Sequence, residues 1–288
     1  WIEVDSITFK KSGNEDLVVD TFTIPALDLI DAETFQINLL DYQGRTQILV
    51  VNDLELASGN YTDMVLSVIR DVNKSYVVEV GEAGDTHTEL RVNSAGLKLG
   101  AFTVDAEGTQ TITAEFDLRK GLTHSSAGNG HYTLKERGVR LQDNSGDRVI
   151  EGRVAASLFN TESPCSEKED PTLGNVVYLY EGFGLAVENL ADMIDPDITD
   201  EDRPDGAIAP FAATTVTENG DGSWAYTFAY LPAGDYTLVF SCDVGSDDPE
   251  YYDGLTLPFP AGQIIERSAQ SSGINCDFPI DDNGKECD

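Results

Sequence analysis

The sequence predicts an all-β protein with two β-sandwich-like domains in tandem and little helix. Polar and apolar side chains alternate with a period of two along many short segments, as where Ile112, Ala114 and Phe116 alternate with Thr113 and Glu115. Gly, Asn and Asp turn signals separate these segments at intervals of roughly ten residues. Segments with a helical period are scarce. Short strands at this spacing are typical of a sandwich or a barrel.

The first half of the chain contains most of the predicted strands. They cover residues 1–9, 35–40, 46–51, 61–71, 75–80, 87–92, 103–105 and 109–118. Residues 41–44, with the sequence DYQG, form the predicted turn between the second and third of these strands. We therefore expect a first β-domain over residues 1–141.

The second half begins after a polar stretch, residues 142–147, that has no apolar side chain. We place a linker at residues 142–148 and a second domain at residues 149–288. Its predicted strands cover residues 149–159, 175–181, 223–230 and 236–242, and the segment 231–235, LPAGD, supplies the turn between the last two.

All four cysteines lie in the second half, and no two of them form a C-x-x-C pair. An even number of widely spaced cysteines suits two disulfides in an oxidising compartment. Three pairings are open, besides free buried thiols. We favour Cys165 with Cys242, because both flank predicted strands, and Cys276 with Cys287, because they close a short terminal loop.

Acidic residues outnumber basic ones by 52 to 18, which gives a formal net charge of −34. This charge argues against binding to nucleic acid or to anionic lipid, since both would be repelled. No apolar run approaches the roughly 20 residues that span a bilayer. The excess of carboxylates fits a saline or calcium-containing exterior, or simply a soluble surface.

Several segments of the first half carry a resemblance to a family. They are residues 56–62 (LASGNYT), 97–104 (LKLGAFTV), 111–116, 116–122 (FDLRKGL) and 132–135 (YTLK). Over about residues 1–141 the chain resembles the bacterial family catalogued as domain of unknown function 4382. The resemblance implies an exported, often lipid-anchored β-domain with no known activity.

Domains of that family usually begin with one more strand before the segment that matches Trp1. Either this strand lies upstream, where a lipid anchor would also lie, or the sheet has an open edge. An open edge would accept a strand from a neighbouring copy of the chain. We therefore name Trp1, Ile2, Val4 and Ile7 as a candidate interface.

The second half resembles the transthyretin-like or carboxypeptidase-regulatory sandwich modules. The resemblance rests on residues 150–154 (IEGRV), 177–180 (VYLY) and 226–238 (YTFAYLPAGDYTL). Such modules are common spacers on surface proteins.

No motif for catalysis is present. The chain has three histidines, His87, His124 and His131, and no G-x-S-x-G elbow accompanies them. A zinc site from His124, His131 and Glu136 is one alternative, but the spacing fits no standard zinc pattern and surface histidines are the simpler interpretation. We expect a protein that is not an enzyme and has no catalytic residues.

Two acidic segments offer oxygen ligands of the kind that calcium binds. The first contains Asp192, Asp195, Asp197, Asp200, Glu201, Asp202 and Asp205, and the second contains Asp243, Asp247, Asp248, Glu250 and Asp253. Neither fits the D-x-D-x-D-G loop, and solvated loops are the alternative. If calcium binds, we expect Asp195, Asp197, Asp200 and Asp202 to be its ligands. No other cofactor is expected.

Aromatic side chains offer a second kind of binding site, because rings stack on the faces of sugars. Tyr251 and Tyr252 lie in the second acidic segment, with Trp224 and Tyr226 on a nearby predicted strand. Core packing explains Trp224 equally well.

Together these features favour a non-enzymatic protein exported to the outer surface of a bacterium. Its role would be structural or in attachment, as a subunit of an extracellular filament built by strand addition. Its partners would be other copies of itself or other surface components, with no nucleic acid and no membrane-spanning segment. The alternative is a calcium-dependent or carbohydrate-binding surface module.

Overall fold

The computed structural model describes residues 1–288 except 82–83, 129, 145–147, 243, 246, 259–263, 270–272, 280–286 and 288. The chain divides into two units, Trp1–Ser145 (unit 1) and Gly146–Asp288 (unit 2). The division falls within the segment that we expected to be a linker, of which residues 145–147 lie outside the described residues. None of the helices in the described part of the chain has the length and the apolar character of a membrane span.

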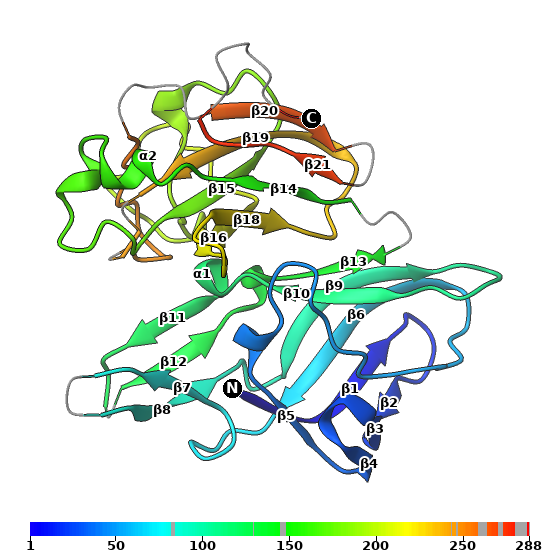
Figure 1. Ribbon diagram of the computed structural model, residues 1–288. Coiled ribbons are helices and arrows are strands. Elements are labelled where there is room, and N and C mark those ends of the chain that lie inside the picture. The colour runs from blue at the N-terminus through cyan, green and yellow to red at the C-terminus, as the bar shows by residue number, and fades with distance from the viewer. Residues whose placement is uncertain are drawn as a thin grey trace. The chain divides into compact units, whose positions relative to one another are not determined.

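Both units are all-β, as the alternating pattern predicted (Figure 1). The α-helices of the described residues are two single turns, α1 (Leu118–Gly121) and α2 (Ser157–Asn160).

Unit 1 contains a main sheet with the strand order β2-β1-β6-β9, in which β5 also pairs with β1. These strands are β1 (Ile2–Lys10), β2 (Leu17–Val19), β5 (Phe35–Ile37), β6 (Gly59–Val68) and β9 (Leu97–Val104). A second sheet has the order β11-β12-β8-β7, from β7 (Tyr76–Glu79), β8 (Thr86–Arg91), β11 (Leu122–Ser125) and β12 (His131–Leu134). Two further pairs are β3 (Phe22–Ile24) with β4 (Leu29–Ala32), and β10 (Ile112–Phe116) with β13 (Val139–Asp143).

Strand β1 lies inside its sheet, so the predicted open edge near Trp1 is wrong. β6 pairs with one side of β1, while β5 and β2 pair with the two ends of its other side. The side chains of Ile2, Val4 and Ile7 are buried in the core of unit 1, with exposed fractions of 0, 0 and 5%. They are therefore core residues, and only Trp1 of the four predicted interface residues is exposed.

Residues 46–51, predicted as a strand, form none. Ile48, Val50 and Val51 nevertheless pack against the core of unit 1. The apolar residues of this segment thus contribute to packing without joining a sheet.

Unit 2 is a sandwich of two four-stranded sheets. One has the order β17-β18-β14-β21, from β14 (Ile150–Arg153), β17 (Thr217–Glu218), β18 (Trp224–Phe228) and β21 (Ile274–Asn275). The other has the order β16-β15-β19-β20, from β15 (Val176–Glu181), β16 (Ala212–Thr215), β19 (Gly234–Ser241) and β20 (Ile264–Ala269). Their facing side chains form one core, which includes Val177, Tyr226, Phe228, Leu238 and Phe240.

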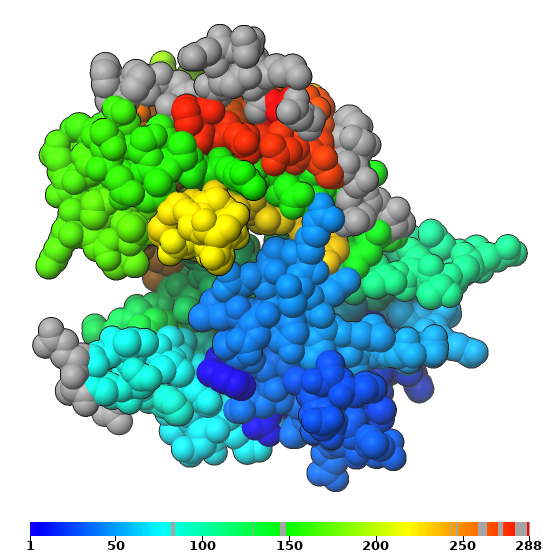
Figure 2. Space-filling view, in the orientation of Figure 1, coloured from blue at the N-terminus to red at the C-terminus, as the bar shows by residue number. Residues whose placement is uncertain are grey.

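The end of the chain returns to the start of unit 2. Strand β21 pairs in parallel with β14, and in the space-filling view the red C-terminal residues lie against the green residues of this region (Figure 2). Gly152 on β14 permits this close approach, because a Cβ atom there would lie 1.9 Å from the carbonyl oxygen of Cys276.

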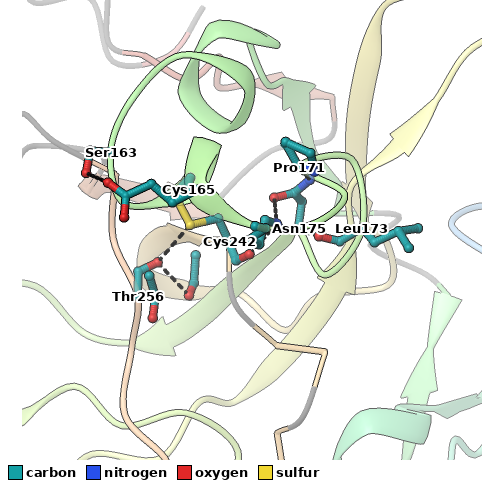
Figure 3. Close-up of a disulfide and its surroundings, with 10 residues drawn as sticks. Ser163, Cys165, Pro171, Leu173, Asn175, Cys242 and Thr256 are labelled. Carbon is teal, nitrogen blue, oxygen red and sulfur yellow. Dashed lines mark hydrogen bonds between the residues drawn. A yellow bond between two sulfur atoms is a disulfide. The ribbon is translucent and has the colours of Figure 1, made fainter.

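Two disulfides join the pairs of cysteines that we favoured from the sequence. Cys165 pairs with Cys242, with their Cα atoms 5.6 Å apart, and Cys276 pairs with Cys287, with theirs 4.2 Å apart. The first connects the segment after α2 to the end of β19 (Figure 3). Lys168 supports this connection, since its Nζ donates to the carbonyl oxygens of Leu173 and Cys242 and to Asn175 Oδ1.

Candidate functional site

A groove of about 810 Å³ lies on unit 1, beside β8 and the segment that connects β11 to β12. Its lining carries side chains of both charges and two imidazoles: Asp71, His87, Glu89, Arg91 and His131. Strand alternation explains why they share a face, because His87, Glu89 and Arg91 are two residues apart on β8. The sequence predicted strand β8 but did not identify this groove.

Three aromatic rings stand in a row that ends at the groove. The ring of His87 stacks on Tyr76, with centroids 4.1 Å apart and an interplanar angle of 13°. Tyr76 in turn stacks on Trp1, at 6.0 Å and 21°. The backbone nitrogen of Trp1 donates to the carbonyl oxygen of Tyr76 at 2.8 Å, which fixes Trp1 beside β7. The outer rings, Trp1 and His87, are exposed.

Two charged side chains of the groove, Glu89 and Arg91, are paired with each other. Arg91 donates to Glu89 Oε2 from both Nε and Nη2, at 2.9 and 2.6 Å, and Arg70 reaches Glu89 Oε1 at 3.4 Å. The hydrogen bonds from Arg91 lower the pKa of Glu89 below its usual value. The groove therefore presents a fixed carboxylate and a fixed guanidinium at neutral pH.

The histidines do not assemble the zinc site that we considered. His124 and His131 belong to adjacent residue pairs of the β11–β12 ladder, His124 with Tyr132 and His131 with Ser125, so their side chains point to opposite faces. Within the described residues, the groups suited to hold a metal include neither histidine.

A second candidate site lies in unit 2, on the outer face of the sheet that contains β15. Strand β15 is buried on both faces: Val177 and Leu179 point into the sandwich core, while Tyr178 and Tyr180 pack under the segments around Leu190 and Val244. These two segments are the acidic loops of the sequence. They cover the sheet with apolar residues and carry their carboxylates directly above the two tyrosines.

Three carboxylates from the two acidic loops meet at this place. One carboxylate oxygen each of Asp192, Asp247 and Asp253 lies within 4.8 Å of those of the other two. The hydroxyl of Tyr178 donates to Asp247 Oδ2 at 2.9 Å, and the hydroxyl of Tyr180 donates to the carbonyl oxygen of Ala191 at 2.6 Å. Strand β15 thus holds both loops in place through its tyrosine hydroxyls.

Asp192 is the most deeply buried acid of this group, with an exposed fraction of 1%. Its Oδ2 accepts a hydrogen bond from the backbone N–H of Asp253 at 2.7 Å. Its Oδ1 is buried and accepts no hydrogen bond from the described residues. Burial raises the pKa of Asp192 to about 7, and the charges of Asp247 and Asp253 add to this effect while backbone hydrogen bonds oppose it.

The structure does not bring the four predicted calcium ligands together as a group suited to a metal. Asp195 Oδ1 accepts from the N–H of Asp197, and Asp200 Oδ1 accepts from the N–H of Asp202. Asp200 Oδ2 also accepts from the N–H of Tyr252. These carboxylates close turns and tie the two acidic loops together. Of the described residues, the acidic group of a geometry suited to a metal is Asp192 with Asp247 and Asp253. Asp243 lies outside the described residues.

A local signal in the sequence marks Asp192 as a candidate ligand. It stands alone among apolar neighbours, in Leu190-Ala191-Asp192-Met193-Ile194. An acid within an apolar run is forced into the interior with its neighbours. Such a carboxylate is a better candidate ligand than the exposed acids that follow it.

The aromatic residues that we considered for sugar binding in unit 2 do not form a platform. Tyr226 is buried, and its hydroxyl donates to the carbonyl oxygen of Cys276. Trp224 packs edge-on against Phe159, with ring centroids 5.1 Å apart. Tyr251 is exposed, and Tyr252 is partly buried.

Comparison with known proteins gives one match, which lies in unit 1. No curated protein and no solved structure matches the chain. The transthyretin-like resemblance of the second half is not confirmed by any match. Residues 1–136 match the family model described as a domain of unknown function (DUF4382), which supports the resemblance found in the first segment.

Proposed function

We propose that the chain is a non-enzymatic attachment protein of the outer surface of a bacterium, and that the groove of unit 1 binds a carbohydrate. The observation that carries this proposal is the row of stacked rings, Trp1, Tyr76 and His87, which ends in a groove lined by paired charges. The aromatic residues that suggested carbohydrate binding in the sequence lie in unit 2, whereas the site proposed here lies on unit 1.

Carbohydrate is the ligand class that this chemistry suits. Sugars offer flat C–H faces to aromatic rings and many hydroxyls to fixed donors and acceptors. In the groove, Glu89 and Asp71 supply acceptors, Arg91 supplies donors, and His87 supplies a ring face. A neutral glycan is favoured over an acidic one, since the chain has a net charge of −34.

Export is supported by the two disulfides of unit 2, because disulfides form and persist in oxidising compartments. The match to a family that we expect to be bacterial and exported adds to this support. Filament assembly by strand addition at β1 does not form part of the proposal, since β1 is paired on both sides.

We further propose that unit 2 is a transthyretin-like spacer. Two four-stranded sheets around one core, with a disulfide just after the end of β19, support this role.

Glycan-array binding of the full chain tests the proposal. We expect binding to neutral glycans, and His87→Ala should weaken the affinity for the best of them about 10-fold or more, equivalent to about 1.4 kcal/mol. His124→Ala is the matched control, because it removes an imidazole that points to the other face of the sheet. Absence of binding by the parent chain, or equal losses for the two variants, would contradict the proposal.

A further inference from the structure

We propose that unit 2 binds one calcium ion between Asp192, Asp247 and Asp253. The site is separate from the groove of unit 1 and does not rest on carbohydrate binding. It also differs from the four ligands expected from the sequence. Its residues come from both acidic loops, one before β16 and one after β19.

The first support is the distance between the carboxylates. Calcium binds oxygens at about 2.3–2.6 Å, so opposite ligands of one ion lie up to about 5 Å apart. The three carboxylate oxygens lie within 4.8 Å of one another, so a single ion can contact all three. Water and backbone carbonyls of the loops would complete the six to eight ligands that calcium requires.

The second support is independent of the clustering. Asp192 has an exposed fraction of 1%, and its buried Oδ1 accepts no hydrogen bond from the described residues. A buried carboxylate oxygen without a partner is costly, because it loses its hydration and gains nothing in return. A cation at the centre of the three carboxylates would supply the missing partner.

The surroundings hold the three carboxylates in place. The Tyr178 hydroxyl donates to Asp247 Oδ2, and the backbone N–H groups of Asp253 and Asp248 donate to Asp192 Oδ2 and Asp253 Oδ2, at 2.7 and 2.8 Å. Such outer contacts orient ligands before the metal arrives. Each of the three carboxylates therefore has one oxygen fixed by a neighbouring donor.

The donor set distinguishes between metals. It consists of carboxylates without histidine or cysteine, which disfavours zinc and copper and favours hard cations. Magnesium usually binds through one or two carboxylates and retains several waters, whereas calcium accepts cages of protein oxygens in irregular loops. Three carboxylates on irregular loops therefore favour calcium.

Binding would join the two acidic loops more firmly. They are already linked by backbone contacts, from the N–H of Asp195 to the carbonyl oxygen of Glu250 and from the N–H of Tyr252 to Asp200 Oδ2. A calcium ion would add a bridge between Asp192 on one loop and Asp247 and Asp253 on the other. The packing of the two acidic loops over Tyr178 and Tyr180 would then depend on calcium.

Isothermal titration calorimetry of the full chain with calcium chloride tests the site. The buffer contains about 0.15 M salt, so that diffuse attraction of calcium to the acidic surface is screened. We expect one saturable site with a dissociation constant of about 10⁻⁴–10⁻³ M, the range of extracellular calcium modules. Asp192→Asn and Asp253→Asn should each weaken binding at least about 10-fold. Asp202→Asn is the matched control, because it removes the same charge from an exposed position of the same loop and should leave the constant unchanged.

Asp253 is exposed, so its variant keeps the test informative if Asp192→Asn fails to fold, which circular dichroism reports. A parent chain without a saturable site would overturn the proposal. So would an Asp202→Asn variant that loses binding as strongly as Asp253→Asn. Magnesium binding as tight as calcium binding would overturn the assignment of the metal.

Discussion

Removal of the disulfide between Cys165 and Cys242 is expected to destabilise unit 2 more than removal of the disulfide between Cys276 and Cys287. The paired residues are 77 positions apart in the first case and 11 in the second. If a disulfide acts mainly by restricting the unfolded chain, these loops correspond to about 4.5 and about 2.8 kcal/mol at 25 °C. Native domains are stable by only about 5–15 kcal/mol, so the longer loop accounts for much of the stability of unit 2.

Urea unfolding of two double variants measures both values. Cys165→Ala with Cys242→Ala and Cys276→Ala with Cys287→Ala avoid placing a hydroxyl in the interior, where Cys165, Cys242 and Cys276 are buried. The two tryptophans lie one in each unit, so a Trp1→Phe background leaves Trp224 as the reporter of unit 2.

The transition of Trp224 should move to lower urea in both double variants, and its slope should rise because the unfolded chain becomes less compact. The larger shift belongs to the Cys165–Cys242 pair. Equal shifts, or the reverse order, would show that loop length does not determine how much each disulfide stabilises unit 2.

Three further predictions concern other contacts. Glu89→Gln should lower the free energy of unfolding of unit 1 near neutral pH. Because Arg91 lowers the pKa of Glu89, the stabilisation by the Glu89 carboxylate is present above the usual pKa of 4.5 and is lost as the pH falls through the lowered pKa. In urea unfolding, the difference in stability between the parent chain and the variant should therefore disappear in acid. Gly138→Ala should cost about 3 kcal/mol in the same assay, because the new Cβ would lie 2.4 Å from a backbone Cα atom that cannot move aside; a loss below about 1 kcal/mol would contradict this contact. Tyr178→Phe should weaken calcium binding about 10-fold in calorimetry, since it removes the hydrogen bond that orients Asp247; unchanged affinity would show that this bond is irrelevant to the site.

The fold class and the disulfides could be predicted because their signals are local. Alternation of side chains along 109–118 depends only on neighbouring residues, and β10 forms there. The cysteine pairs followed from their places beside strands and at the end of the chain. Alternation acts over a few residues, and four cysteines leave only three possible sets of two disulfides.

The pairing of β1 could not be read from the sequence. Its neighbours β2 and β5 are three residues long each, and the segment 17–19 shows too little alternation to mark a strand. The resemblance to a family with an additional strand then suggested an open edge at β1. In the structure, β2 and β5 of the same chain occupy that edge. Short strands are defined by their hydrogen-bonded partners more than by their own side chains.

The acidic site has a similar explanation. Counting charges selected Asp195, Asp197, Asp200 and Asp202, which are close in sequence. The carboxylates that meet come from two loops that only the fold brings together, above Tyr178 and Tyr180. The groove of unit 1 likewise depends on the parallel pairing of β12 with β8, which no local pattern indicates.

The presence of calcium on the acidic loops is tested most directly by a crystal structure of the full chain grown with calcium chloride. Anomalous scattering distinguishes a bound calcium ion from water at the same place. We predict one strong anomalous peak within about 2.6 Å of oxygens from Asp192, Asp247 and Asp253. A structure with no peak at these residues, or with its peak among Asp195, Asp197, Asp200 and Asp202, would show that calcium does not bind at the proposed site.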